Sequence, residues 1–153
     1  RNKFVMNGKD YSSGMVELRI PAQAEYIQLV RTVIGEIAAI DPNLSLGRIA
    51  DLRLAVSEAV TNAYREHTRQ NIDDQIIVRC DLTKGKIEIE INDQGAGFNP
   101  NEIPDLPNVE DPARLNHESG VGFSLIRELS DETIVETGEN GTKVRLIFNL
   151  NNV

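Results

Sequence analysis

The chain shows two kinds of apolar periodicity, and together they predict a domain built from both strands and helices. From Val16 to Ile20, apolar residues alternate with charged ones, which is typical of a half-buried strand, and Pro21 ends it. Apolar residues then recur at helical spacing over residues 22–40, which predicts a first helix. Its predicted core positions are Tyr26, Ile27, Val30, Ile34, Ile37 and Ala38.

The clearest apolar stripe falls on a second predicted helix, over residues 46–67, for which Ser45 is a suitable N-terminal cap. Two strands, over residues 76–82 and 86–92, should follow as a hairpin. In the second of them isoleucines alternate with polar residues, so one face should be buried and the other solvated. The stripe on the helix consists of Ile49, Leu52, Val56, Ala59, Val60 and Ala63.

The second half of the chain combines an irregular stretch with regular elements. Residues 99–119 contain four prolines and little periodicity, and such a stretch inside a compact domain is usually functional, so we expect a lid or binding loop. Residues 122–129 should form a third helix, and residues 132–137 and 142–150 a closing hairpin. This order predicts an α+β fold, a two-layer α/β sandwich with a mainly antiparallel sheet and the helices on one face.

The composition is that of a globular domain. Of the 153 residues, 40% are hydrophobic and 26% are charged. We expect residues 14–153 to form a single domain, and residues 1–13 to be a disordered or artificially introduced N-terminus. This terminal stretch is polar and lacks an apolar signal core, so we expect no secretion. No apolar run approaches the ~20 residues needed to cross a bilayer, and we therefore expect a cytoplasmic protein.

Charge and cysteine content narrow the possible partners. A net charge of −8 argues against nonspecific binding to nucleic acid or anionic lipid, because both need clustered cations. A protein partner or a small ligand is favoured. The single cysteine, Cys80, excludes an internal disulfide and a cysteine-built zinc site. It lies in an apolar run, so we expect a buried, inert thiol that suits a reducing cytosol.

A polar pair on the second predicted helix has the residue types that phosphoryl transfer needs. Glu58 and Asn62 are four residues apart and therefore project from the same helical face, at the flank of the apolar stripe. An amide oxygen suits Mg²⁺, which takes few protein ligands beside phosphates and waters. A nearby carboxylate can orient a hydroxyl nucleophile and accept its proton. The alternative is an ordinary polar pair on a solvated helix face.

An acidic residue followed by two glycines ends the second strand of the first hairpin. Asp93 can accept a hydrogen bond from an exocyclic amine such as the 6-amino group of adenine. Gly95 and Gly97 let the backbone turn sharply and allow a flat ring to come close. The alternative is a common strand-ending turn.

A second glycine pair, Gly120 and Gly122 around Val121, lies where the irregular stretch meets the third helix. A helix N-terminus presents unpaired N–H groups and a positive dipole end, which favours phosphate. A flexible hinge is the alternative. The chain lacks the G-x-x-x-x-G-K-[ST] loop, and this pair does not join an early strand to a helix. The P-loop and dinucleotide-fold interpretations therefore fail.

Three further residues are weaker candidates for contacts with a nucleotide. Thr142 starts the last strand and offers a hydroxyl near a base, although a plain β-forming threonine is an equal explanation. Arg65, one turn beyond Asn62, can neutralise phosphate charge, and Arg114 in the predicted lid can do the same. For both arginines, an ordinary surface position is the alternative.

These motifs resemble those of a known family. The Glu58-x-x-x-Asn62 helix, the Asp93-x-Gly95-x-Gly97 turn and Gly120-x-Gly122 match the N box and the two glycine boxes of one ATPase superfamily, which includes gyrase, Hsp90, histidine kinases and MutL. The flanking sequences resemble the bacterial anti-sigma-factor serine kinases of sporulation and general stress switches. The matching stretches span about Ile20 to Leu150, and they are Ile20–Ala22, Leu29–Arg31, Leu54–Ala63 and Leu125–Asp131.

The resemblance implies the Bergerat ATP-binding fold in one ATP-binding kinase domain. It also implies a homodimer that holds a sigma factor inactive and uses Mg-ATP to phosphorylate a serine (or threonine) of an anti-anti-sigma factor. By matching position, Asn62 would hold Mg²⁺, Glu58 would be the general base and Asp93 would read adenine. Further roles also carry over: Gly97 and Thr142 beside the base, Gly120, Val121 and Gly122 at the phosphates, and Arg31 on the surface shared by sigma factor and antagonist.

One departure from the family pattern leaves the activity open. Many relatives place a histidine four residues after the metal-binding asparagine, where this chain has Glu66. Its charge could slow the chemistry or alter the metal requirement, so a nucleotide-gated binding protein without significant kinase activity is one alternative. A histidine-kinase-type ATPase domain is another. His67 and His117, however, lie inside the ATP module rather than in an upstream helix pair. Because the magnesium and base positions are intact, we favour an active kinase.

Overall fold

The computed structural model describes residues 5–6, 9–10, 14–42, 44–69, 75–83, 85–93, 118–138 and 141–149. Two short strands near the N-terminus, β1 (Val5–Met6) and β2 (Lys9–Asp10), pair antiparallel. Among the described residues, no helix is both long and apolar enough to span a membrane.

The main sheet has five strands, and every neighbouring pair runs antiparallel. The strands lie in the order β3-β4-β5-β7-β6, so the last hairpin inserts its second strand next to β5 and leaves its first strand at the edge. Their bounds are β3 (Gly14–Ile20), β4 (Ile76–Thr83), β5 (Lys86–Asp93), β6 (Glu132–Gly138) and β7 (Gly141–Asn149).

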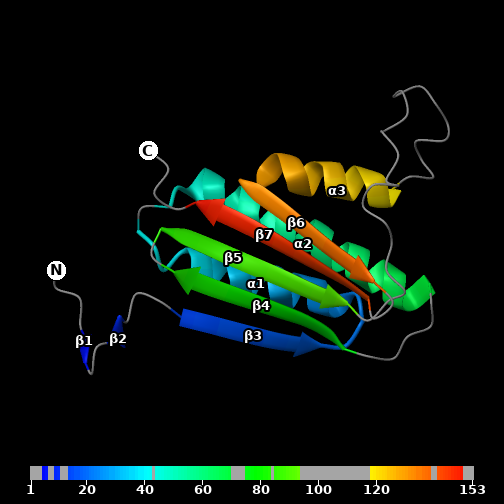
Figure 1. Ribbon diagram of the computed structural model, residues 1–153, viewed down its shortest axis with the longest axis horizontal. Helices are drawn as coiled ribbons and strands as arrows, with labels where there is room; N and C mark the ends of the chain where they lie inside the picture. Colours follow the sequence, from blue (N-terminus) through cyan, green and yellow to red (C-terminus); the bar gives the residue numbers. More distant parts are fainter. Residues whose placement is uncertain are drawn as a thin grey trace.

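Three helices cover one face of this sheet (Figure 1). They are α1 (Glu25–Ala38), α2 (Leu46–Arg69) and α3 (Glu118–Leu129). The central helix is α2, which contacts α1 on one side and α3 on the other and also lies against β4 and β5. The predicted two-layer α+β sandwich is therefore confirmed.

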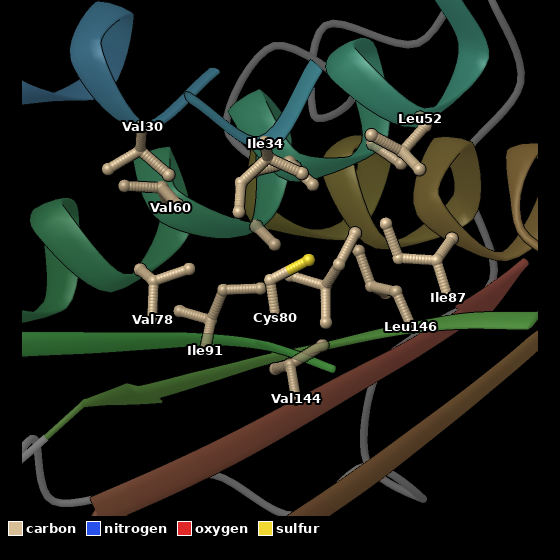
Figure 2. Close-up of a cluster of buried hydrophobic side chains, with 14 of the residues drawn as sticks. Val30, Ile34, Leu52, Val60, Val78, Cys80, Ile87, Ile91, Val144 and Leu146 are labelled. Atoms are coloured by element: carbon tan, nitrogen blue, oxygen red, sulfur yellow. The ribbon is translucent and has the colours of Figure 1, made fainter. Parts of the chain in front are cut away.

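The core lies between the two layers because the central strands β4, β5 and most of β7 alternate buried and partly exposed side chains. Strand β4 shows this pattern along its whole length, and β5 repeats it in the opposite phase. Burying a Val, Leu or Ile side chain stabilises the fold by roughly 1.5–3 kcal/mol. Figure 2 shows the central part of the cluster, whose labelled residues are Val30, Ile34, Leu52, Val60, Val78, Cys80, Ile87, Ile91, Val144 and Leu146.

The other face of the sheet carries a ladder of cross-strand ion pairs. Arg79 Nε lies 2.7 Å from a carboxylate oxygen of Glu17, and Arg145 Nε lies 3.3 Å from one of Glu88. Hydrogen bonds from Arg79 and then from Arg19 hold the pKa of the Glu17 carboxyl below its usual value. A face with this many charges stays in water, which explains why the helices cover only the other side.

Most predicted elements match the structure within a few residues. Ser45 caps α2 as expected, because its Oγ accepts a hydrogen bond from the backbone N–H of Arg48 at 3.1 Å. The predicted start of the third helix was wrong, since α3 begins at Glu118 rather than at Gly122. Glycines disfavour a helix by ~1 kcal/mol each, but a carboxylate at the positive end of the helix is favourable. The remaining part of the predicted lid lies outside the described residues.

Candidate functional site

The central helix α2 positions both residues of the predicted phosphoryl-transfer pair. Glu58 is half-buried, whereas Asn62, one turn later, is only 9% exposed. Neither Oδ1 nor Nδ2 of Asn62 has a hydrogen-bond partner among the described residues. Leaving such a buried polar group unpaired costs about 1–3 kcal/mol. Most buried polar groups in native proteins are paired, so an amide without a partner among the described residues is a candidate for binding a ligand.

The neighbours of Asn62 on α2 explain how its amide comes to be buried. Ala59 and Ala63 belong to the apolar stripe and are buried against the rest of the core. The helix contacts α3 along one side and β5 beneath it, so a residue at the flank of the stripe is enclosed between elements. Glu58 lies further toward the solvent side and keeps partial exposure.

Asp93 is the last residue of β5, and the strand pairing fixes its surroundings. Its register partner on β7 is Thr142, whose backbone N–H donates to Asp93 Oδ1 at 3.3 Å. The two residues are 6% and 3% exposed, which places a carboxylate and a hydroxyl side by side in a nearly closed environment. Thr142 in turn pairs with Thr137 on β6, and their hydroxyl oxygens lie 3.1 Å apart.

The elements that carry these residues converge at one end of the sandwich. Figure 1 shows the end of α2, the start of α3, the end of β5, the end of β6 and the start of β7 all at the same end, on the right. Gly120, Val121 and Gly122 lie in the first turns of α3. The first four backbone N–H groups of a helix lack intrahelical partners and form the positive end of its dipole, which suits an anion. Because α3 begins at Glu118, Gly120 is among these positions, whereas Gly122 already lies within the helix.

The other predicted site residues are placed as follows. Gly95, Gly97 and Arg114 lie outside the described residues. Arg65 is exposed on α2 one turn beyond Asn62, and Arg31 is exposed on α1.

The described residues offer no metal site made of acidic side chains, histidines or cysteines. No group of three or more such side chains among them is arranged to hold a metal ion. A magnesium ion at this end would therefore depend on the Asn62 amide oxygen together with oxygens of a ligand and of water. That donor set is the one that Mg²⁺ accepts when it accompanies phosphates.

One residue at this end of the molecule was not predicted from the sequence. Thr137 belongs to no recognised sequence motif. It lies at the site because β6 pairs with β7 in a register that places Thr137 opposite Thr142. A signal was present in the chain, since a threonine before Gly138 and one after Gly141 flank the same tight turn. Two residues that flank a hairpin turn symmetrically are cross-strand neighbours.

Comparison with known proteins identifies the family of the chain. The sequence profile of the histidine kinase-like ATPase domain matches residues 20–148. An anti-sigma F factor from Caldanaerobacter subterraneus subsp. tengcongensis is 36% identical over 140 residues, which cover 88% of this chain and 92% of that protein. The serine-protein kinase RsbW from Staphylococcus epidermidis is 33% identical over 136 residues, covering 86% of this chain and 84% of the relative.

Solved structures agree with this family in their fold. A Mycobacterium tuberculosis structure of RsbU and RsbW domains superimposes with a TM-score of 0.63 at 20% identity, covering 90% of this chain and 32% of that one. The SiaB–SiaC complex from Pseudomonas aeruginosa also gives 0.63, at 12% identity, covering 87% and 88% of the two chains. The chain therefore belongs to the family of histidine kinase-like ATPase domains, among relatives named anti-sigma factors and serine-protein kinases.

Proposed function

We propose that this protein is an anti-sigma factor with ATP-dependent protein serine/threonine kinase activity. It binds and inhibits an RNA polymerase sigma factor in the cytoplasm, and it phosphorylates a serine (or threonine) of an anti-anti-sigma antagonist. The names of the relatives support this class of function. The observation that carries the proposal is the buried amide of Asn62, which has no hydrogen-bond partner among the described residues. Asn62 lies in the second half of α2, and this helix ends at the same end of the fold as β5, whose last residue is Asp93.

In this proposal the base and the phosphates of ATP meet different elements. The Asp93 carboxylate accepts a hydrogen bond from the 6-amino group of adenine, and Thr142 lies beside the ring. The start of α3, with Gly120, Val121 and Gly122 in its first turns, binds phosphate oxygens at the positive end of the helix dipole. The glycines Gly95 and Gly97 and the cations Arg65 and Arg114 complete the nucleotide contacts.

Asn62 has the chemistry required to hold the magnesium ion that accompanies ATP. Its Oδ1 is shielded from solvent and has no partner among the described side chains, so a bound cation would satisfy it. When bound, Mg²⁺ supplies positive charge that offsets the negative charge on the phosphate oxygens. The helix α2 keeps this oxygen in place because its apolar stripe is fixed in the core.

Glu58 is the general base of the proposed reaction. The hydroxyl oxygen of the antagonist's serine forms a bond to the γ-phosphorus, the bond to the β–γ bridging oxygen breaks, and ADP leaves with that electron pair. The proton of the hydroxyl passes to the Glu58 carboxylate. Its partial exposure lets a protein substrate reach it, and its position one turn before Asn62 keeps it near the phosphates.

We also propose a homodimer, with Arg31 on the surface that the sigma factor and the antagonist share. Arg31 is exposed on α1, which leaves its guanidinium accessible to a partner carboxylate. Exposed apolar side chains on β3 and α1 support an interface on this side of the sandwich, namely Met15, Val16 and Leu29.

Replacing Glu58 by Gln tests the catalytic assignment. The substitution keeps the shape of the side chain but removes the proton acceptor, so transfer of labelled γ-phosphate to the antagonist should fall roughly 100- to 10,000-fold. ATP affinity, measured by calorimetry, should stay near that of the wild type because Glu58 does not hold the nucleotide. Asp51→Asn is the matched control, since Asp51 is a half-buried acidic residue on the same helix, two turns before Glu58.

The outcomes separate the proposed function from its alternatives. Normal transfer by the Glu58→Gln variant would remove Glu58 from the base role. ATP binding by the wild type without any label on the antagonist would support a nucleotide-gated binding protein instead. Absence of ATP binding by the wild type would reject the nucleotide site altogether.

A further inference from the structure

Thr137 stands at the end of a row of polar side chains that crosses three strands. The register pairs Asp93 on β5 with Thr142 on β7, and Thr142 with Thr137 on β6. Two hydrogen bonds follow this row: the Thr142 N–H to Asp93 Oδ1 at 3.3 Å, and the contact of the two threonine hydroxyls at 3.1 Å. Only Asp93 and Thr142 enter the proposed adenine site directly, which leaves Thr137 without an assigned role.

We propose that Thr137 is a positioning residue that sets the purine preference of the site by donating its hydroxyl proton to Thr142. The proposal rests on the proposed function, because it concerns the same nucleotide site. Thr137 does not touch the base. It acts through the Thr142 hydroxyl and determines whether that group presents a proton or a lone pair to the ligand.

The direction of the hydrogen bond between the threonines matters because a hydroxyl has one proton and two lone pairs. If Thr137 donates, Thr142 accepts with one lone pair and keeps its own proton for the ligand. If Thr142 donates instead, its proton is used and it faces the ligand as an acceptor. Thr142 is 3% exposed, so few waters are available to compensate for a mismatched partner.

The two purines differ at the atoms that this row would meet. Adenine presents an amino donor at position 6 and an acceptor at ring nitrogen 1, whereas guanine presents a carbonyl acceptor at position 6 and a donor at nitrogen 1. A carboxylate that accepts, followed by a hydroxyl that donates directly or through one water, complements adenine. The same pair would set a carboxylate against the guanine carbonyl. A hydrogen bond that Thr137 donates to the Thr142 hydroxyl therefore favours ATP over GTP.

The Asp93 carboxylate can take part in both contacts. A carboxylate has about four lone-pair positions, and the Thr142 N–H uses one of them. The same backbone contact fixes Asp93 relative to Thr142, so the acceptor and the hydroxyl keep a constant spacing. Thr137 then adds the one feature that the backbone cannot set, which is the rotation of the Thr142 hydroxyl.

A matched control for Thr137 lies on the same strand, β6, four residues earlier in the chain. Thr133 lies on the same face of β6 as Thr137, is also half-buried, and places its hydroxyl 2.6 Å from Ser130 Oγ. Because Ser130 donates to the carbonyl of Ile126 at 2.8 Å, Thr133 is the donor in that pair. Thr133→Val therefore removes a comparable hydroxyl donor on the same strand but leaves the row to Asp93 unchanged.

The test measures the affinity of the full chain for ATP and for GTP by calorimetry with Mg²⁺ present. Thr137→Val should weaken ATP binding about three- to tenfold, the range for one neutral hydrogen bond, and should leave GTP binding nearly unchanged. The ratio of the ATP affinity to the GTP affinity should therefore fall by the same factor. Thr137→Ser should restore it, because serine keeps the hydroxyl, and Thr133→Val should leave it as in the wild type.

Each outcome of these measurements either supports or overturns the proposed role of Thr137. An unchanged ATP preference in Thr137→Val, or an equal change in Thr133→Val, would overturn the role of Thr137 while the nucleotide site itself stands. A wild-type protein that binds neither nucleotide would overturn the proposed function, and this inference with it. Thermal unfolding of each variant separates a loss of fold from a loss of preference, since a purely structural role would weaken ATP and GTP binding alike.

Discussion

At the scale of single residues, burial is the main cause of the chemical behaviour of the one thiol of the chain. Cys80 lies on β4 within the core and is 1% exposed, as expected from the apolar run around it. Burial raises the pKa of this thiol from 9.0 to about 12, and the neighbouring Asp81 carboxylate adds to the effect. The thiolate is the reactive form, so a thiol that stays protonated is chemically inert.

This raised pKa predicts a loss of stability in alkali. Above about pH 9 the unfolded chain loses the thiol proton while the folded chain keeps it up to about pH 12, so the free energy of unfolding should fall as pH rises through this window. Urea unfolding of the wild type and of Cys80→Ala at several pH values would measure how the free energy of unfolding changes with pH. The alanine variant should start less stable, because it leaves a small cavity, but should lose less stability with pH. Parallel pH profiles would contradict the prediction.

The candidate site shows which residue-level features the sequence reveals. Four-residue spacing was enough to place Glu58 and Asn62 on the same face of α2. The burial of the Asn62 amide could not be predicted, because it depends on how other elements pack around α2. The contact of Thr137 with Thr142 was missed for a similar reason, since a hydroxyl contact across a hairpin requires the register to be known.

At the scale of whole elements, one arginine connects three of them. Arg48, in the first turn of α2, donates to the carbonyl of Leu129 at 2.7 Å and to the carboxylate of Asp131 at 2.5 Å. The same carboxylate accepts the backbone N–H of Asn149 at 2.6 Å, and the Arg48 guanidinium lies 4.9 Å from the ring centre of Phe148. These contacts join the start of α2, the end of α3 and the end of β7, which lie at the same end of the sandwich (Figure 1), whereas Asn62 lies in the second half of α2.

Replacing Arg48 by Met should therefore loosen α3 more than removal of an exposed ion pair would. The methionine keeps an apolar stem of similar length but leaves the Leu129 carbonyl and the Asp131 carboxylate with fewer partners, so the free energy of unfolding should fall by about 1–3 kcal/mol. Arg19→Met is the matched control. It removes an exposed pair with Glu17 at 3.0 Å, and such pairs contribute about 0–1 kcal/mol. If urea unfolding gave equal losses of unfolding free energy for Arg48→Met and Arg19→Met, Arg48 would contribute no more than an exposed surface charge.

The elements themselves were largely predictable, whereas the contacts that lock them together were not. Apolar stripes with periods of two and 3.6 identified the strands of the main sheet and the three helices, because those stripes form the core. The start of α3 was misplaced since glycines suggested a boundary. The contact of Arg48 with Asp131 spans 83 positions of the chain, and no local pattern predicts it.

At the scale of the whole molecule, the strand order depends on differences in burial that local periodicity does not reveal. The closing hairpin places β7 beside β5 and leaves β6 at the edge. Strand β7 is buried at five of its nine positions, whereas none of the seven positions of β6 is buried. Placing the more apolar strand inside buries more apolar surface, which is the main driving force of folding.

The opposite edge of the molecule is where we place the homodimer interface. Strand β3 pairs only with β4, so one of its backbone edges has no neighbour within the described sheet. Met15 is 59% exposed, and Leu29 on the adjacent helix α1 is 47% exposed. Val16 belongs to the helix-covered face of β3, yet it is still 37% exposed. Exposed apolar side chains that gather in one region of the surface are typical of an interaction site.

Light scattering on the intact protein, at tens of micromolar, should give about twice the 17.0 kDa of one chain. Leu29→Asp should shift the protein toward a monomer, because a charged side chain would be buried without a partner in the interface, typically at a cost of several kcal/mol. The control is Leu46→Asp, which changes a leucine that is 85% exposed at the start of α2, away from β3. A monomeric wild type, or equal dissociation by both variants, would remove the interface from β3 and α1. Because neither leucine belongs to the nucleotide site, ATP affinity should be unchanged in both variants, so that a loss of the dimer can be distinguished from a loss of fold.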